Sequence, residues 1–364
     1  MSYGPTLAVY GGLLIGLAFG AAGLLSGFCL LSSLRGWWGN GDGRLARTYA
    51  LAIGVAVLAT QFLTLGHVVD LDKSIYLQAS FSAPLMFFGG LLFGYGMVLA
   101  NGCASRALVL LGRGNLRSFV VVVTVAIVAQ MTLKGLIAPA RLAALQATQS
   151  TPQVLSLPGL LATLGLDAAT ARGLAMLAVS GGLFAFAFSH AAFRKSGGQI
   201  VAGVVIGLLV AGGWFATGVL GADDFNPVPV ASLTYVAPIA DSVQYVMLST
   251  GLTLNFGIAL VGGVVAGSLV TALATNRFRF EGYGSPGHMI RSIGGAALMG
   301  AGGAMALGCS VGQCLTGVST LALASLIAAT GIVIGAALGL RGPLQVRALT
   351  PDAAAPVSRP RRAH

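Results

Sequence analysis

The sequence predicts an all-α polytopic membrane protein, and its composition and the length of its apolar runs are the observations that predict this class. Of the 364 residues, 56% are hydrophobic and only 8% are charged, whereas a soluble domain usually carries about 25% charged residues. So few charges cannot cover a water-facing surface. Glycine, at 54 residues, is about twice as frequent as usual, and glycine lets membrane helices approach closely. We therefore expect a tightly packed helical bundle.

Apolar runs near the ~20 residues needed to cross a bilayer occur about nine times along the chain. The expected spans are 6–27, 46–67, 81–100, 116–139, 171–193, 199–219, 250–274, 289–307 and 319–340. Four shorter apolar pieces are too short to cross, and we expect them to be re-entrant half-helices or interfacial segments. They are 103–112, 157–166, 230–248 and 310–318.

The charges in the connections between these spans predict the orientation in the membrane. Basic residues predominate at 35–47, 106–117, 194–195 and 277–291 and again in the C-terminal tail. With nine spans, all of these segments lie on the side of the C-terminus, which the positive-inside rule makes cytoplasmic. We therefore expect the N-terminus outside, the C-terminus in the cytoplasm and a basic, disordered tail at 346–364. The net charge of +11 is then a feature of membrane topology, and it does not indicate nucleic-acid binding.

An internal repeat divides the chain. Gly12–Leu17 is echoed by Gly203–Leu208, an offset of 203 − 12 = 191, and Gly102–Cys103 is echoed by Gly308–Cys309, an offset of 309 − 103 = 206. Four spans on each side of one linking span give a 4+1+4 arrangement. The single linking span reverses the orientation of the second copy in the membrane. Inverted repeats are typical of transporters, whose sites lie near the membrane centre where broken helices meet. The expected parts are repeat one (6–140), a linking helix (171–193) and repeat two (199–340) within one transmembrane domain (1–345).

Both copies contain a spanning helix that ends in Gly-Cys and is followed by a short apolar piece. In the first copy the break is Asn101–Gly102, a pair that tolerates positive φ and interrupts helices. We expect the following half-helices to approach the membrane centre from opposite sides. Because helix N-terminal amides carry partial positive charge, they suit an anion. This arrangement would place Cys103 and Cys309 on one shared pathway.

The same segments resemble the signatures of the YeeE/YedE sulfur-transport family. Phe93–Arg106 with Gly112–Ser118 is similar to the first signature, and Met299–Gly312 is similar to the second. Gly27–Cys29 resembles the cysteine near the end of the family's first helix. The resemblance covers most of residues 6–340. It implies a multi-pass transporter of the bacterial inner membrane that imports thiosulfate or a related small sulfur anion.

The resemblance also implies roles for particular cysteines. In that family, three pathway cysteines contact thiosulfate in turn through S–H···S hydrogen bonds, and by motif these are Cys29, Cys103 and Cys309 here. It further implies a small cytoplasmic sulfur-carrier protein of the TusA type as a partner. Cys314 departs from the family pattern, and we expect it to be a packing residue.

The chemistry of thiosulfate suggests which residue types would bind it. Its terminal sulfur is soft and suits a neutral thiol, whereas its oxygens suit backbone N–H groups and hydroxyls. Weak contacts are useful because a transported ion must also leave. The candidate substrate-contacting residues are Cys29, Asn101, Gly102, Cys103, Arg106, Gly308, Cys309 and Ser310.

Four of these candidates have structural alternatives. Arg106 could attract the anion or serve as an ordinary positive-inside anchor. Asn101 could touch substrate or cap the following half-helix. The Ser310 hydroxyl could bind an oxygen or its own helix backbone. At the offset of 191, Cys29 corresponds to Leu220 of the second copy. The repeat therefore gives Cys29 no equivalent thiol.

Other functions are less favoured by the sequence. A membrane thiol–disulfide redox protein would use Cys309 with Cys314, or Cys29 with Cys103, but neither pair has the two-residue spacing of redox motifs. A pore for small neutral solutes would not need thiols. No histidine has a second ligand at metal spacing, so we expect no enzyme, no metal and no cofactor.

Overall fold

The computed structural model describes residues 4–39, 41–223, 228–342 and 344–345. This part of the chain is helical and contains no strand. Eight of its helices are long and apolar enough to cross a membrane, which confirms the all-α polytopic class. The expected cytoplasmic tail at 346–364 lies outside the described residues.

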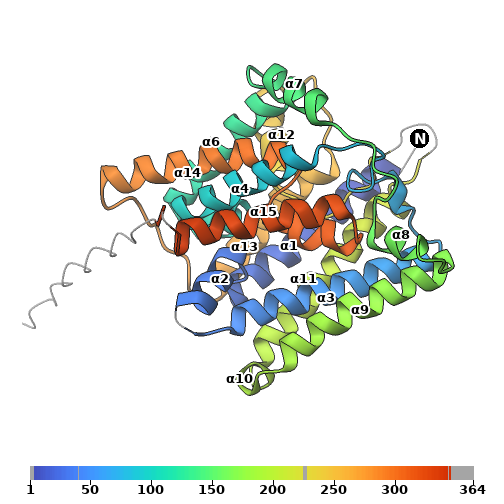
Figure 1. Cartoon of the computed structure of the whole chain (residues 1–364). Helices are drawn as coiled ribbons and strands as arrows, with labels where there is room; N and C mark the ends of the chain where they lie inside the picture. Colours follow the sequence, from blue (N-terminus) through green and yellow to red (C-terminus); the bar gives the residue numbers. More distant parts are fainter. Residues whose placement is uncertain (1–3, 40, 224–227, 343, 346–364) are drawn as a thin grey trace, which may run out of the picture.

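The helices follow one another with few long connections (Figure 1). Their bounds are α1 Gly4–Ser26, α2 Leu30–Gly39, α3 Arg44–Leu65, η1 Leu71–Lys73, α4 Ala83–Leu99, α5 Ala104–Gly112, α6 Leu116–Leu133, α7 Ala138–Thr148, α8 Leu157–Ala162, α9 Ala168–Phe188, α10 Ala191–Arg194, α11 Gly197–Phe215, η2 Ala216–Leu220, α12 Val236–Met247, α13 Phe256–Ala274, α14 Pro286–Met305, η3 Gly312–Gly317 and α15 Leu323–Leu340.

Each expected span contains one long helix. The span expected at 289–307 coincides with α14, which has 20 residues but is not one of these eight helices. His288 and Arg291 in its first turns lower its hydropathy. The four short pieces correspond to α5, α8, α12 and the turns around η3. α2 was not expected, because its polar and aromatic residues resemble a loop.

Glycines bring the backbones of the long helices together. α1 packs against α13, and α3 packs against α11. A Cβ atom at Gly12 of α1 would lie 2.5 Å from the Phe256 carbonyl oxygen of α13, and one at Gly207 of α11 would lie 2.7 Å from the Ala52 carbonyl oxygen of α3. Real Cβ contacts are not this short, so only glycine permits this spacing. The high glycine content therefore serves helix packing, as the composition predicted.

α4 and α14 cross through a reciprocal set of glycine contacts. A Cβ at Gly96 would lie 2.5 Å from the Gly295 oxygen, and a Cβ at Gly89 would lie 2.8 Å from the Gly302 oxygen. The 206-residue offset exchanges these two contacts, since 96 + 206 = 302 and 89 + 206 = 295. Gly96, near the end of α4, meets Gly295, and Gly89, nearer the start of α4, meets Gly302, which comes later in α14. The two helices therefore run antiparallel. An inverted repeat requires this relationship between equivalent helices.

The remaining packing follows the same pattern. α4 also packs on α15, and α14 packs on α6, so that the four helices lie together in Figure 1. α9, which links the two halves of the chain, packs on α3 at the edge of the bundle (Figure 1). The short helices α2 and α5 lie against α3 and α6, respectively.

Candidate functional site

Three of the four cysteines occupy the same structural position. Each cysteine immediately precedes a short helix and lies two residues after a backbone position with positive φ. The pairs are Gly27 (φ 71°) with Cys29, Asn101 (φ 59°) with Cys103, and Leu307 (φ 55°) with Cys309. A left-handed residue turns the chain sharply at the end of each long helix. The turn leaves each thiol at a helix N-terminus, where the free amides carry partial positive charge.

The first two thiols form a close pair. Cys29 Sγ and Cys103 Sγ lie 3.8 Å apart, and the two residues are only 2% and 1% exposed. The amides of Ser32 and Cys103 lie beside the Cys29 sulfur, and the Ser105 hydroxyl lies 3.2 Å from Cys103 Sγ. The pair is therefore surrounded by groups that can donate hydrogen bonds.

The second Gly-Cys segment, Gly308–Cys309, lies beside the Cys29–Cys103 pair. Cys309 is fully buried, and its sulfur accepts a hydrogen bond of 3.3 Å from the Gly312 amide. The hydroxyl of the next residue, Ser310, lies beside the Cys103 thiol. The Tyr49 hydroxyl holds this segment by donating to the Ser310 carbonyl at 2.8 Å. The structure thus brings Cys29, Cys103, Cys309 and Ser310 into one buried cluster, which we term the thiol cluster.

Tyr235 completes the thiol cluster and was missed in the sequence. It immediately precedes α12 as Cys29 precedes α2, and 235 − 29 = 206, the offset that relates Cys103 to Cys309. The pairing of Cys29 with Leu220 is therefore wrong, because the extra residues of the second half lie between α11 and α12. Tyr235 is fully buried and close enough to interact electrostatically with both Cys103 and Cys309.

Two cavities approach the Gly-Cys breaks from opposite ends of α6 and α14. A cavity of about 230 Å³ includes Asn101 and Gly102 and touches the N-terminal ends of both helices at Ser118 and Ser292. A narrower cavity of about 140 Å³ includes Leu307 and Gly308. Its further walls come from the C-terminal ends of the same helices, at Leu133, Gly303 and Ala304.

The larger cavity carries an excess of positive charge, and we term it the basic cavity. Arg106, Arg117 and His288 line it together with one acidic residue, Glu281. The Glu281 carboxylate is already bound by Arg113 at 3.1 Å and by the Asn115 amide at 2.7 Å. The narrow cavity has mainly apolar walls, and Gln78 and Thr234 are its polar side chains.

Two arginines tie the thiol-bearing segments to each other. Arg35 of α2 donates from Nη1 to Asn101 Oδ1 at 2.7 Å, so the helix after Cys29 holds the turn before Cys103. Arg106 of α5 donates to the Gly23 carbonyl at 3.2 Å, so the helix after Cys103 holds the end of α1.

These bonds bear on two of the alternatives left open by the sequence. Asn101 does not cap α5, whose N-cap residue is Cys103 without a side-chain capping bond. Instead, the Asn101 side chain accepts a hydrogen bond from Arg35 and lines the basic cavity. Arg106 lines the basic cavity and donates a hydrogen bond to α1, a position that suits attraction of an anion. Arg35 carried no sequence signal beyond its place in a basic connection.

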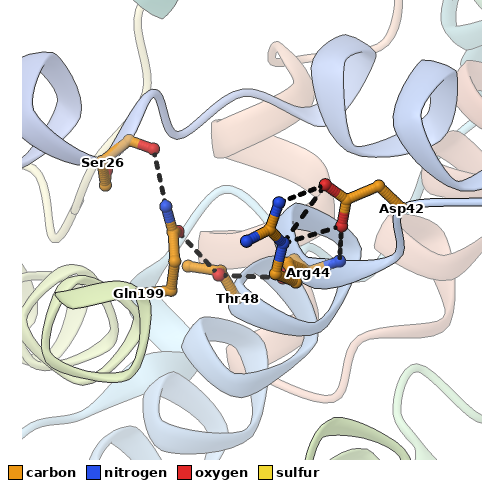
Figure 2. Close-up of polar contacts among 5 residues, drawn as sticks. All are labelled: Ser26, Asp42, Arg44, Thr48 and Gln199. Carbon is orange, nitrogen blue, oxygen red and sulfur yellow. Dashed lines mark hydrogen bonds and ion pairs between the residues drawn. The ribbon is translucent and has the colours of Figure 1, made fainter. Parts of the chain in front are cut away.

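A third contact fixes the end of α1 immediately before the first break. Figure 2 shows Gln199 of α11 donating to the Ser26 carbonyl at 3.1 Å and accepting from the Thr48 hydroxyl at 2.9 Å. The same view shows Arg44 bound to Asp42, with 2.8 Å between Nη2 and Oδ2. Hydrogen bonds from Arg44 lower the pKa of Asp42 to about 2, so this exposed ion pair persists at neutral pH.

Cys314 differs from the other cysteines. It is 5% exposed and lies within η3, a π-helical segment, so its thiol is not at a helix start. Among the described residues, no group of three or more His, Cys, Asp or Glu side chains could hold a metal ion.

Comparison with known proteins agrees with this architecture. The family described as sulphur transport matches residues 25–338 of the chain, a stretch that contains every residue of the thiol cluster. The thiosulfate transporter TsuA of Escherichia coli (strain K12) is 24% identical over 320 residues, which cover 84% of this chain and 86% of TsuA. The chain therefore belongs to the sulphur transport family of multi-pass membrane proteins.

Proposed function

We propose that this protein imports thiosulfate, or a related small sulfur anion, through the thiol cluster. The observation that supports the proposal is that two cavities, near opposite ends of α6 and α14, each reach a residue next to one of the helix-N-terminal thiols. Each cavity includes the glycine of one Gly-Cys break, Gly102 or Gly308. We infer that the anion passes between the two cavities by way of these thiols.

The proposed ligand matches the groups that surround it. The basic cavity attracts an anion, and the helix N-termini at Cys103 and Cys309 stabilise its charge. Neutral thiols contact the terminal sulfur through S–H···S hydrogen bonds, which are weak enough to be exchanged from one cysteine to the next. Passage past Cys309 to the Cys29–Cys103 pair would then deliver the anion to the basic cavity.

The orientation in the membrane is inferred from the distribution of charge. Arg35 and Arg117 lie at the end of the bundle that carries the basic cavity, and by the positive-inside rule this end faces the cytoplasm. The N-terminus would then lie outside and the C-terminus inside, in a bacterial inner membrane. The antiparallel crossing of α4 and α14 supports the inverted 4+1+4 repeat on which this topology depends. A TusA-like sulfur carrier would collect sulfur from the imported anion at the basic cavity.

A thiol–disulfide redox protein is the second candidate, and the 3.8 Å separation of the Cys29 and Cys103 sulfurs favours it. Both thiols, however, are buried, so a client protein has no exposed sulfur to attack. Thiol titration without reductant separates the two candidates. Four free thiols support transport, whereas a stable disulfide between these two cysteines supports redox chemistry.

Growth on thiosulfate as the sole sulfur source tests the proposal. The gene is expressed in bacteria that lack their own thiosulfate and sulfate uptake, and growth with cysteine as the sulfur source is the control for expression and toxicity. We expect the wild-type protein to restore growth on thiosulfate and Cys103→Ala to abolish it. Restored growth by Cys103→Ala would contradict the thiol pathway and would favour a pore that does not use sulfhydryl groups.

A further inference from the structure

Tyr235 has a buried hydroxyl without a hydrogen-bond partner. The residue is fully buried, and its Oη atom has no partner within the protein. A buried polar group of this kind destabilises a fold, and native proteins retain few of them. The presence of this unpartnered hydroxyl therefore requires an explanation other than stability.

The surroundings of Tyr235 direct this hydroxyl to the thiol cluster. Its ring packs against Phe19, with 5.3 Å between the ring centroids, and its backbone amide lies beside the Cys309 sulfur. The phenol is near enough to interact electrostatically with Cys103 as well as Cys309. Tyr235 thus stands where the repeat would otherwise place the counterpart of the Cys29 thiol.

Tyr49 provides an internal comparison. It is a buried tyrosine of the same aromatic cluster, with its ring stacked on Phe28 at 4.8 Å. Its hydroxyl, however, donates to the Ser310 carbonyl at 2.8 Å. The Tyr49 hydroxyl therefore has a structural partner in the protein, whereas the Tyr235 hydroxyl does not.

We propose that the Tyr235 hydroxyl donates a hydrogen bond to an oxygen of the sulfur anion and is the residue that selects oxygen-bearing substrates. The inference rests on the proposed function and extends it. Thiols recognise the terminal sulfur, and the unpartnered hydroxyl of Tyr235, together with the Ser310 hydroxyl, recognises the oxygens. The preferred ligand is then an anion with a terminal sulfur and oxygens on the adjacent atom. Hydrosulfide, which has no oxygens, would gain less from Tyr235, because its sulfur is a weaker hydrogen-bond acceptor than an oxygen.

Calorimetric binding of thiosulfate and hydrosulfide to the full chain in lipid nanodiscs tests this role. We expect Tyr235→Phe to weaken thiosulfate binding by about 10- to 100-fold, because a hydrogen bond to a charged ligand is lost. Hydrosulfide binding should weaken less than thiosulfate binding does, since sulfur is a weaker hydrogen-bond acceptor than a charged oxygen. The melting temperature without ligand should stay equal or rise, because the variant removes a buried group that lacked a partner.

Matched variants separate recognition from folding. Tyr49→Phe should lower the melting temperature, because the Ser310 carbonyl loses its donor, and should weaken thiosulfate binding less than Tyr235→Phe does. Ser310→Ala should weaken thiosulfate binding without lowering the melting temperature. Equal thiosulfate affinity in wild type and Tyr235→Phe would overturn the role of Tyr235. A parallel loss of thermal stability and of affinity for both anions would also overturn it. Failure of the wild-type protein to bind thiosulfate would instead contradict the proposed function.

Discussion

The sulfur atoms of Cys29 and Cys103 lie 3.8 Å apart although 74 residues separate them in the chain. Each sulfur stands at the start of a short helix, and the turns before these helices are joined by the bonds from Arg35 and Arg106. The pair is therefore a product of tertiary structure, and neither helix alone would create it. Its proximity to Cys309 and Ser310 makes it the centre of the proposed pathway.

Thiosulfate should protect particular cysteines from alkylation. If the anion occupies the thiol cluster, it will slow the reaction of Cys29, Cys103 and Cys309 with a small neutral maleimide. Cys314, which lies within η3, should react at the same rate with or without thiosulfate. Peptide mass spectrometry after timed alkylation measures each rate. Equal protection of all four thiols would indicate a general conformational change instead of contact with the anion.

Loss of the Arg35–Asn101 bond should impair transport more than stability. Arg35→Ala frees the turn before Cys103, and we expect thiosulfate uptake to fall about 3- to 30-fold, as estimated from a charge-assisted hydrogen bond. Arg35→Lys should recover part of the activity, because a single donor can still reach the amide oxygen.

Arg44→Ala is the matched control for this variant. Arg44 is also a basic residue of the same connection, but it pairs with Asp42 in an exposed position (Figure 2). Its removal should leave uptake within about twofold of wild type, since exposed ion pairs contribute little. An equal loss of uptake in both variants would show that general positive charge matters and that the bond to Asn101 does not.

Adjacent glycines in α14 should respond in opposite ways to substitution by alanine. A Cβ at Gly295 would lie 2.6 Å from the Ala100 amide nitrogen, whereas a Cβ at Gly294 meets nothing within 4 Å. Gly295→Ala should therefore lower the free energy of unfolding by roughly 1–3 kcal/mol. Gly294→Ala should raise it by up to about 1 kcal/mol. Thermal unfolding of the two variants in the same detergent makes the comparison, and similar stabilities would contradict the close crossing of α4 and α14.

The orientation in the membrane can be tested at the two ends of α9. Asp167 and Lys195 are exposed on either side of this linking helix. In intact cells, a membrane-impermeant maleimide should label Asp167→Cys and should label Lys195→Cys only after the membrane is opened. The buried native cysteines should react little, and the parent protein serves as the control. The reverse pattern would place the basic cavity outside and would contradict the proposed orientation.

The long helices could be predicted from sequence because their signal is local. Apolar length and glycine content identified the spans, and the Gly-Cys pairs marked the positions where Asn101 and Leu307 adopt positive φ. The hydropathy of α14 is lower than that of a typical spanning helix, because Arg291 lies within its second turn.

The remaining features depend on contacts between distant segments. The Arg35–Asn101 bond joins residues 66 positions apart. The equivalence of Cys29 and Tyr235 was hidden by the longer connection between α11 and α12. Asp241 of α12 pairs with Lys134, 107 positions earlier in the chain, at 3.4 Å. No sequence pattern distinguishes the satisfied hydroxyl of Tyr49 from the unpartnered one of Tyr235.

Uptake of radiolabelled thiosulfate into proteoliposomes is the most direct test of a thiol-lined route through the membrane. Wild type and three alanine variants, at Cys103, Cys309 and Cys314, are reconstituted at equal protein content. We predict that Cys103→Ala and Cys309→Ala lose at least about nine-tenths of the initial rate, equivalent to roughly 1.4 kcal/mol or more, while Cys314→Ala retains the wild-type rate. Wild-type rates in both Cys103→Ala and Cys309→Ala would contradict the account.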